Sequence, residues 1–195
     1  MKPAGLILSA GESRRMGRAK ALLEFNGETF LDGLIARFAA VCDPVIVVLG
    51  HQPGAILSGI RRASEARFVV NPRHALGQLT SMQAGLRALP PGTGGVVFTL
   101  VDHPNVPAGT LRALLAHSDA LLAIPVHLER RGHPIFFRSE LIPEFLALPP
   151  DGQARDVVRR HRDETVYVPI DDPGILDDID DPAAYESLTN ARVNA

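Results

Sequence analysis

Short apolar segments alternate with helical patterns along most of this chain, and that alternation restricts the folds open to it. The apolar segments are continuous runs, at 5–8, 45–49, 68–70, 96–100 and 121–124. Continuous apolar runs are typical of strands that are covered on both faces, as in a parallel sheet. Apolar residues at helical spacing follow between them, at 30–40, 55–63, 79–89 and 107–117. The pattern predicts a doubly wound α/β fold that binds its ligands at the carboxyl ends of the strands.

The alternation changes after Pro125, where a polar stretch at 127–132 leads directly into the apolar run 134–137. This predicts a small β-hairpin insertion in an otherwise mainly parallel, Rossmann-like sheet. The remaining expected elements are helices at 139–148 and 153–161, a strand at 165–168, and a last helix that begins at Pro182 with Asp181 as its N-cap. Residues 190–195 are expected to fray. With 195 residues and no linker, the chain is expected to form a single domain, 1–195.

Composition and charge exclude several classes of partner. The chain has 20 Lys and Arg against 22 Asp and Glu, a net charge of −2 that is too balanced for a nucleic-acid or anionic-membrane binder. No apolar stretch is long enough to span a membrane, the first one is too short for a signal peptide, and the lone Cys42 forms no internal disulfide. We therefore expect a cytoplasmic protein. An acidic stretch at 163–186 beside a basic remainder favours an anionic small ligand together with a cation.

The loop that follows the first apolar run has the composition of a polyphosphate site. Small residues Ser9, Ala10 and Gly11 allow close approach of the backbone to a ligand, and glycine can turn N–H groups toward an anion. Four cations follow within seven residues, namely Arg14, Arg15, Arg18 and Lys20. The segment is neither a Walker loop nor a dinucleotide fingerprint, and a solvated basic turn is the alternative interpretation.

The order of residues in this loop resembles the opening motif of the nucleoside-triphosphate transferase superfamily, in particular its molybdenum-cofactor nucleotidyltransferase (MobA/MocA-like) branch. The opening motif is Leu-Ser-Ala-Gly-Glu-Ser-x-Arg-Met-Gly-x-x-Lys, from Leu8 to Lys20. Four later segments resemble that branch in the same order: Asn71-Pro72 with 77–86, Leu100-Val-Asp-His-Pro104, Gly132-His-Pro134 and Asp178-Ile-Asp-Asp-Pro182. Two segments depart from the pattern. The acidic residue before Arg155 is displaced, and Asp181 replaces a threonine.

The resemblance implies an enzyme that transfers a nucleoside monophosphate to a phosphate-bearing acceptor with the help of Mg²⁺. By analogy, Ser9, Ala10 and Gly11 bind phosphates through the backbone with Arg15 alongside, and Lys20 reaches the α-phosphate. Asp102 is the implied metal ligand, because a carboxylate at a strand end suits Mg²⁺, whereas capping of a turn is its alternative role. Asp178 or Asp180 supplies the second carboxylate, and the spacing favours Asp180. Asn71, Thr80 and Ser81 are the remaining candidate contacts to the nucleotide, with helix capping as the alternative role of Thr80 and Ser81. His133 is a candidate contact on the acceptor side, with turn packing as its alternative, and Arg155 is carried over from the resemblance without an assigned partner.

The implied activity is that of a molybdenum cofactor cytidylyltransferase, which uses CTP and molybdopterin. Guanylyl members of the branch usually carry glycine where this chain has Ala10, which favours cytidine. Three alternatives stay open: a guanylyltransferase of the same branch, a sugar-phosphate or phosphocholine nucleotidyltransferase, and a nucleotide-binding regulator without catalytic activity. Retention of both Lys20 and Asp102 favours an enzyme over the regulator.

Overall fold

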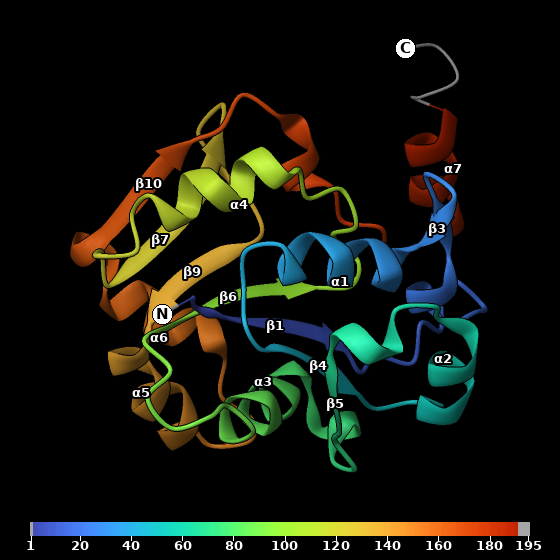
Figure 1. Cartoon of the computed structure of the whole chain (residues 1–195), viewed down its shortest axis with the longest axis horizontal. Coiled ribbons are helices and arrows are strands. Elements are labelled where there is room, and N and C mark those ends of the chain that lie inside the picture. Colours follow the sequence, from blue (N-terminus) through green and yellow to red (C-terminus); the bar gives the residue numbers. More distant parts are fainter. Residues whose placement is uncertain (1, 191–195) are drawn as a thin grey trace.

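A computed structural model describes residues 2–190 and places strands from both halves of the chain in one sheet (Figure 1). Its strands follow the order β10 (Thr165–Pro169), β7 (Leu122–His127), β9 (Ile135–Arg138), β6 (Gly95–Leu100), β1 (Ala4–Ser9), β4 (Val45–Leu49) and β5 (Arg67–Val70), with β8 (Arg130–Arg131) paired to β7. β1 is parallel to both β4 and β6, and β10 is parallel to β7. The predicted α/β fold with a mainly parallel sheet is confirmed.

Helices cover both faces of this sheet, as the continuous apolar runs predict. One face carries α1 (Phe30–Ala39) and α4 (Ala108–Leu115), and the other carries α3 (Gln78–Arg87), α5 (Ile142–Ala147) and α6 (Ala154–Arg160) (Figure 1). α7 (Pro182–Asn190) lies beside β3, where Tyr185 packs on Phe30 at the start of α1 (Figure 1). Successive strand residues point to opposite faces, so Leu6 packs in one core cluster and Ile7 in the other. α2 (Pro53–Gly59) adds Ile56 to the α1 side. A small separate sheet pairs β2 (Glu24–Phe25) with β3 (Glu28–Thr29).

Residues 134–137 contribute more than a hairpin to the fold. A hairpin does form between β7 and β8, where Val126 pairs with Arg131. The next apolar run becomes β9, which lies between β6 and β7 and is antiparallel to both. Phe136 and Phe137 are buried on opposite faces of the sheet, which explains why the run belongs in its interior. Because β9 runs against β6, its first residues lie at the edge where β6 ends.

Several predicted element boundaries were wrong by a few residues. The expected helix at 55–63 begins at Pro53 and ends at Gly59, because Ile60 is extended and 63–65 form a separate 3-10 turn. The expected helix at 139–148 divides into a 3-10 turn at 139–141 and α5. Asp181 caps α7 as predicted, since its Oδ1 accepts a hydrogen bond from Ala184 N at 2.9 Å. The expected fraying concerns 191–195, outside the described residues, and Asn190, which ends α7.

The other short elements are 3-10 turns: η1 (Lys20–Leu22), η2 (Ala63–Glu65), η3 (His74–Leu76), η4 (Ser139–Leu141), η5 (Arg162–Glu164) and η6 (Pro173–Leu176). Within residues 2–190, no helix has the length and apolar character needed to cross a membrane.

Candidate active site

The loop after β1 folds back so that Lys20 lies beside the ends of the central strands. Ser13 organises the turn: its carbonyl accepts hydrogen bonds from Met16 N and Gly17 N, and its Oγ accepts one from Lys20 N. Gly17 has a φ of 71°, a left-handed conformation that favours glycine. The loop therefore delivers Lys20, the first residue of η1, to the carboxyl edge of the sheet.

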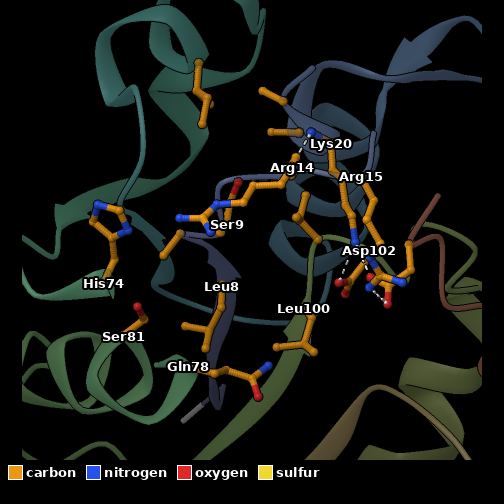
Figure 2. Close-up of a pocket in the computed structure, with 18 residues that line it drawn as sticks. Leu8, Ser9, Arg14, Arg15, Lys20, His74, Gln78, Ser81, Leu100 and Asp102 are labelled. Carbon is orange, nitrogen blue, oxygen red and sulfur yellow. Dashed lines mark hydrogen bonds and ion pairs between the residues drawn. The ribbon is translucent and has the colours of Figure 1, made fainter. Parts of the chain in front are cut away.

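Lys20 lies between two carboxylates in a nearly buried position. Its Nζ donates to Asp180 Oδ1 at 2.5 Å and to Asp102 Oδ2 at 3.2 Å, and only 10% of its side chain is exposed. Arg15 Nη2 donates to the other oxygen of Asp180 at 2.5 Å (Figure 2). Burial opposes the charged ammonium, but the two carboxylates outweigh it and raise the pKa of Lys20. Lys20 is therefore a fixed cation.

A backbone contact holds the C-terminal carboxylates against the end of β6. Ile179 N donates to the carbonyl oxygen of Asp102 at 2.9 Å, so 177–180 lies alongside Asp102. Hydrogen bonding by Lys20, followed by that of Arg15, lowers the pKa of Asp180. Burial, with the charges of Asp102 and Asp180, raises the pKa of Asp178. Two neighbouring acidic residues thus have opposite electrostatic surroundings.

A cavity of about 310 Å³ opens beside this charged cluster (Figure 2). Its lining contains most of the predicted site residues: Ser9, Ala10, Gly11, Arg15, Lys20, Ser81, Asp102 and Asp180. These residues come from the loop after β1, the start of α3, the end of β6 and the segment before α7. The cavity lies at the carboxyl edge of the sheet, where the doubly wound fold predicts a ligand site.

Asn71 and Thr80 are not part of this lining, although the sequence analysis assigned both to the nucleotide. Asn71 Nδ2 donates to Thr80 Oγ1 at 2.9 Å and to Ser81 Oγ at 3.0 Å. Thr80 Oγ1 donates in turn to the carbonyl oxygen of Gly77, in front of α3. The structure gives these two side chains a clear positioning contact with Ser81, while direct contact with the nucleotide stays a prediction.

Several residues that line the first cavity were not assigned an individual role from the sequence. Arg14, His74 and Gln78 also line the cavity. Gln78 lies inside the second resembling segment and His74 just before it, so the motif was the available signal. Gln78 and Leu100 also line a second cavity of about 600 Å³. The two cavities therefore adjoin each other at these two side chains.

The second cavity contains His133, the predicted contact on the acceptor side, and Arg155, which the sequence analysis carried over without an assigned partner. His133 and Arg155 line it together with Arg131, Phe98, Ile135 and Phe145. The His133 ring stacks on His103, with centroids 4.3 Å apart. Burial lowers the pKa of His133 to about 3, so this imidazole is neutral. The cavity is thus mainly apolar with two arginines at its surface, which suits a ring system that carries an anionic group.

The charged cluster has donor atoms that fit a divalent cation. Asp102 Oδ1 is buried and, among residues 2–190, has no hydrogen-bond partner. One ligand atom each from Asp102, His103 and Asp178 can be chosen so that all three lie within 4.8 Å of one another. Asp180 is outside this group of three, and its two oxygens are engaged in ion pairs with Lys20 and Arg15. The predicted preference for Asp180 over Asp178 as second ligand therefore stays a prediction, and His103 is a donor that the sequence analysis missed.

Comparison with known proteins agrees with this geometry. A model of the family described as "MobA-like NTP transferase domain" matches residues 5–165. The chain belongs to this family. The match includes the loop after β1 with Lys20, the end of β6 with Asp102, and the two residues of α3 that line the first cavity, Gln78 and Ser81. The MobA-like chain is therefore a nucleotidyltransferase.

Individual relatives of the MobA-like chain differ in their stated substrates. It is 28% identical to the purine catabolism protein PucB of Bacillus subtilis, over 96% of both chains. It is 27% identical to the molybdenum cofactor cytidylyltransferase of Escherichia coli, over 91% of this chain and 90% of that protein. A probable molybdenum cofactor guanylyltransferase of Synechococcus elongatus is 56% identical over 73% of this chain and 75% of its own length.

Solved structures share the whole fold of the MobA-like chain. Rv0371c of Mycobacterium tuberculosis superimposes with a TM-score of 0.84 at 26% identity, covering 97% of this chain and 98% of that one. A structure of Rv0371c in complex with manganese gives a TM-score of 0.82 at 24% identity, covering 98% and 100% of the two chains.

Proposed function

We propose that this protein transfers a nucleoside monophosphate from a nucleoside triphosphate to the terminal phosphate of the molybdenum cofactor, with CTP as the preferred donor. The observation that carries the proposal is the pair of adjoining cavities that meet at Gln78 and Leu100, next to the cluster of Lys20, Asp102 and Asp180. One cavity is lined by backbone and cations, as a triphosphate requires. The other is larger and mainly apolar, as a pterin ring requires.

The residues of the first cavity support transfer without a general base. An attacking phosphate is already anionic, so the enzyme must position two anions and neutralise their charge. Lys20 and Arg15 lie at the cavity edge and can each exchange Asp180 for a phosphate oxygen. Since Lys20 is nearly buried, its charge acts in a poorly screened environment, where transition-state stabilisation is strongest.

A divalent cation, when bound, supplies positive charge to the phosphate oxygens. Asp102 would hold it together with Asp178 or Asp180, because Asp102 Oδ1 is buried without a hydrogen-bond partner within the described residues. The manganese complex of the structural neighbour Rv0371c is consistent with a divalent cation in a protein of this fold. Mg²⁺ prefers oxygen ligands, so a site made of two carboxylates alone would favour this ion.

The preference for CTP rests on Ala10. Ala10 is 7% exposed and lines the triphosphate cavity, so its Cβ reduces the space beside the bound nucleotide. The cytidylyltransferase relative covers most of the chain and supports this donor. The Synechococcus relative, named as a probable guanylyltransferase, supports GTP as the second candidate.

The test combines CTP, GTP, ATP and UTP with the molybdenum cofactor, a sugar 1-phosphate and phosphocholine, and measures pyrophosphate release. We expect release only with the molybdenum cofactor, and faster release with CTP than with GTP. The isosteric variant Asp102→Asn, purified in parallel, measures any contaminating activity. Equal or faster release with GTP would overturn the cytidylyl assignment, release with another acceptor would overturn the molybdenum cofactor, and binding without release would identify a regulator.

A further inference from the structure

His103 has the environment of a metal ligand, although its motif suggested no such role. Its side chain is 11% exposed, and its Nδ1 lies 2.6 Å from the carbonyl oxygen of Asp177. A carbonyl oxygen only accepts, so Nδ1 is the donor in this contact and Nε2 is the ring nitrogen left to bind a cation. Metal-binding histidines are commonly fixed in this way, by donation from the other ring nitrogen to a carbonyl.

The Nε2 atom of His103 lies near Asp102 Oδ1, the oxygen of that carboxylate that has no hydrogen-bond partner among residues 2–190. The two atoms are 4.0 Å apart, a separation that leaves room for a shared cation bonded to each at about 2.1 Å. Lys20 occupies the other oxygen, Oδ2. The two oxygens of Asp102 therefore have separate contacts, and a cation can be held by Oδ1 without loss of the Lys20–Asp102 ion pair.

Asp178 completes a set of one imidazole and two carboxylates. A ligand atom from each of the three residues lies within 4.8 Å of the others. Asp178 is exposed and adjoins Asp177, whose carbonyl fixes His103, so one short segment both orients the imidazole and adds a carboxylate. Mg²⁺ selects oxygen donors, whereas an imidazole nitrogen favours transition-metal ions.

We infer that Asp102, His103 and Asp178 form a mixed nitrogen and oxygen site for a divalent transition-metal ion, and that His103 makes this site prefer Mn²⁺ over Mg²⁺. The inference rests on the proposed function for the location of the cation, but it concerns metal selection. A site made of carboxylates alone would favour Mg²⁺. In the inferred site the imidazole of His103, the residue after Asp102, determines which ion is preferred.

The test measures Mn²⁺ binding to the whole protein in the absence of nucleotide and acceptor, by the loss of the free Mn²⁺ signal in electron paramagnetic resonance. We expect one bound ion, with pulsed spectra that show coupling to an imidazole ¹⁴N. His103→Gln should abolish this coupling and weaken Mn²⁺ binding at least tenfold, on the scale seen when a metal-site partner is lost, while Mg²⁺ affinity from competition changes less than threefold.

Two further variants keep the test decisive if His103→Gln does not fold. Asp178→Asn changes an exposed residue and should weaken Mn²⁺ binding while keeping the ¹⁴N coupling. His127→Gln is the matched control, because His127 Nδ1 also lies on a backbone carbonyl, that of Ile170, but outside this group. It should bind Mn²⁺ as the wild type does.

Absence of ¹⁴N coupling in the wild type, or its loss in His127→Gln, would overturn the inference. Mn²⁺ binding that depends on Asp180 but not on Asp178 would do the same. Because no substrate is present, these outcomes are independent of the proposed transfer reaction. The proposed transfer reaction has its own contrary outcome: the metal binds with the expected coupling, but no pair of substrates releases pyrophosphate.

Discussion

Lys20 is the residue whose position most directly predicts an effect on turnover. Its ammonium is held between Asp102 and Asp180 at the cavity edge. Lys20→Ala should reduce kcat by about 10²–10³-fold, the loss typical of one transition-state donor, while triphosphate affinity falls much less. Arg18→Ala removes a cation from the same loop outside the cavity lining and should leave kcat within about twofold of the wild type. Stopped-flow pyrophosphate assays with parallel binding titrations measure both quantities, and a few-fold effect of Lys20→Ala on kcat would contradict this role.

A second prediction at the residue scale concerns the methyl group of Ala10 and the choice between CTP and GTP. Its backbone is held in place, because its carbonyl oxygen accepts a hydrogen bond from His51 N and lies only 2.5 Å from the position that a Cβ on Gly50 would take. Ala10→Gly should therefore change only the space at Cβ. Steric selection of this kind is of order 1–3 kcal/mol, so we expect CTP to be preferred over GTP by a factor of tens in the wild type.

The variant Ala10→Gly should shift kcat/KM toward GTP and leave CTP use nearly unchanged. Competition assays with both triphosphates in one reaction give this ratio directly. An unchanged ratio would show that Ala10 does not select the base.

At the scale of elements, a histidine joins the two helices that border the second cavity. His161, after α6, lies with Nδ1 2.9 Å from Glu164 Oε1 and with Nε2 2.7 Å from Glu144 Oε1 on α5. Carboxylates only accept, so both bonds require the protonated ring. The hydrogen bonds to Glu164 and then Glu144 outweigh desolvation and raise the pKa of His161.

A raised pKa in the folded state fixes the sign of the pH dependence. The stabilisation is complete below the unfolded value, about pH 6.5, and is lost as the pH rises through the higher folded value. His161→Gln should therefore show a smaller loss of unfolding free energy between about pH 6 and pH 9 than the wild type, by less than about 1 kcal/mol because the carboxylates are partly exposed. Urea titrations measure this difference. His127→Gln should keep the wild-type slope, and equal slopes for all three proteins would contradict the assignment.

The elements also show which features the sequence could specify. The continuous apolar runs correctly predicted β1, β4 and β6, because strands that are covered on both faces of a sheet carry apolar residues at nearly every position. The same criterion could not place 134–137, since a short apolar run fits a hairpin as well as the interior of a sheet. The sequence pointed to the acidic segment 178–180 but could not decide whether Asp178 or Asp180 faces Asp102. The position of each carboxylate depends on the path of the backbone, which the hydrogen bond from Ile179 N to Asp102 fixes. His103 could not be found from spacing, because its contact with Asp177 joins distant segments.

At the scale of the whole molecule, the adjoining cavities predict that donor and acceptor binding can be separated by mutation. Arg155 lines only the larger cavity. Arg155→Ala should raise the KM for the acceptor about tenfold, as expected for loss of a charge-assisted hydrogen bond, and leave the KM for the triphosphate within about twofold. Arg159→Ala removes a cation from the same helix, one turn away, that is paired with Asp156 and does not line the cavity. Steady-state kinetics with each substrate varied in turn measures both KM values. Equal effects of the two variants on the KM for the acceptor would contradict the prediction.

The ion pairs of Lys20 and Arg15 with Asp102 and Asp180 also have a consequence for product inhibition. Without substrate, the positive charges at the cavity edge are already balanced. A simple anion such as sulfate or inorganic phosphate must displace a carboxylate and leave it uncompensated, which disfavours occupation of the site by such ions. As pyrophosphate departs, the same carboxylates can return to Lys20 and Arg15. The protein thus competes with its own leaving group for these cations, and this competition favours release over the reverse reaction.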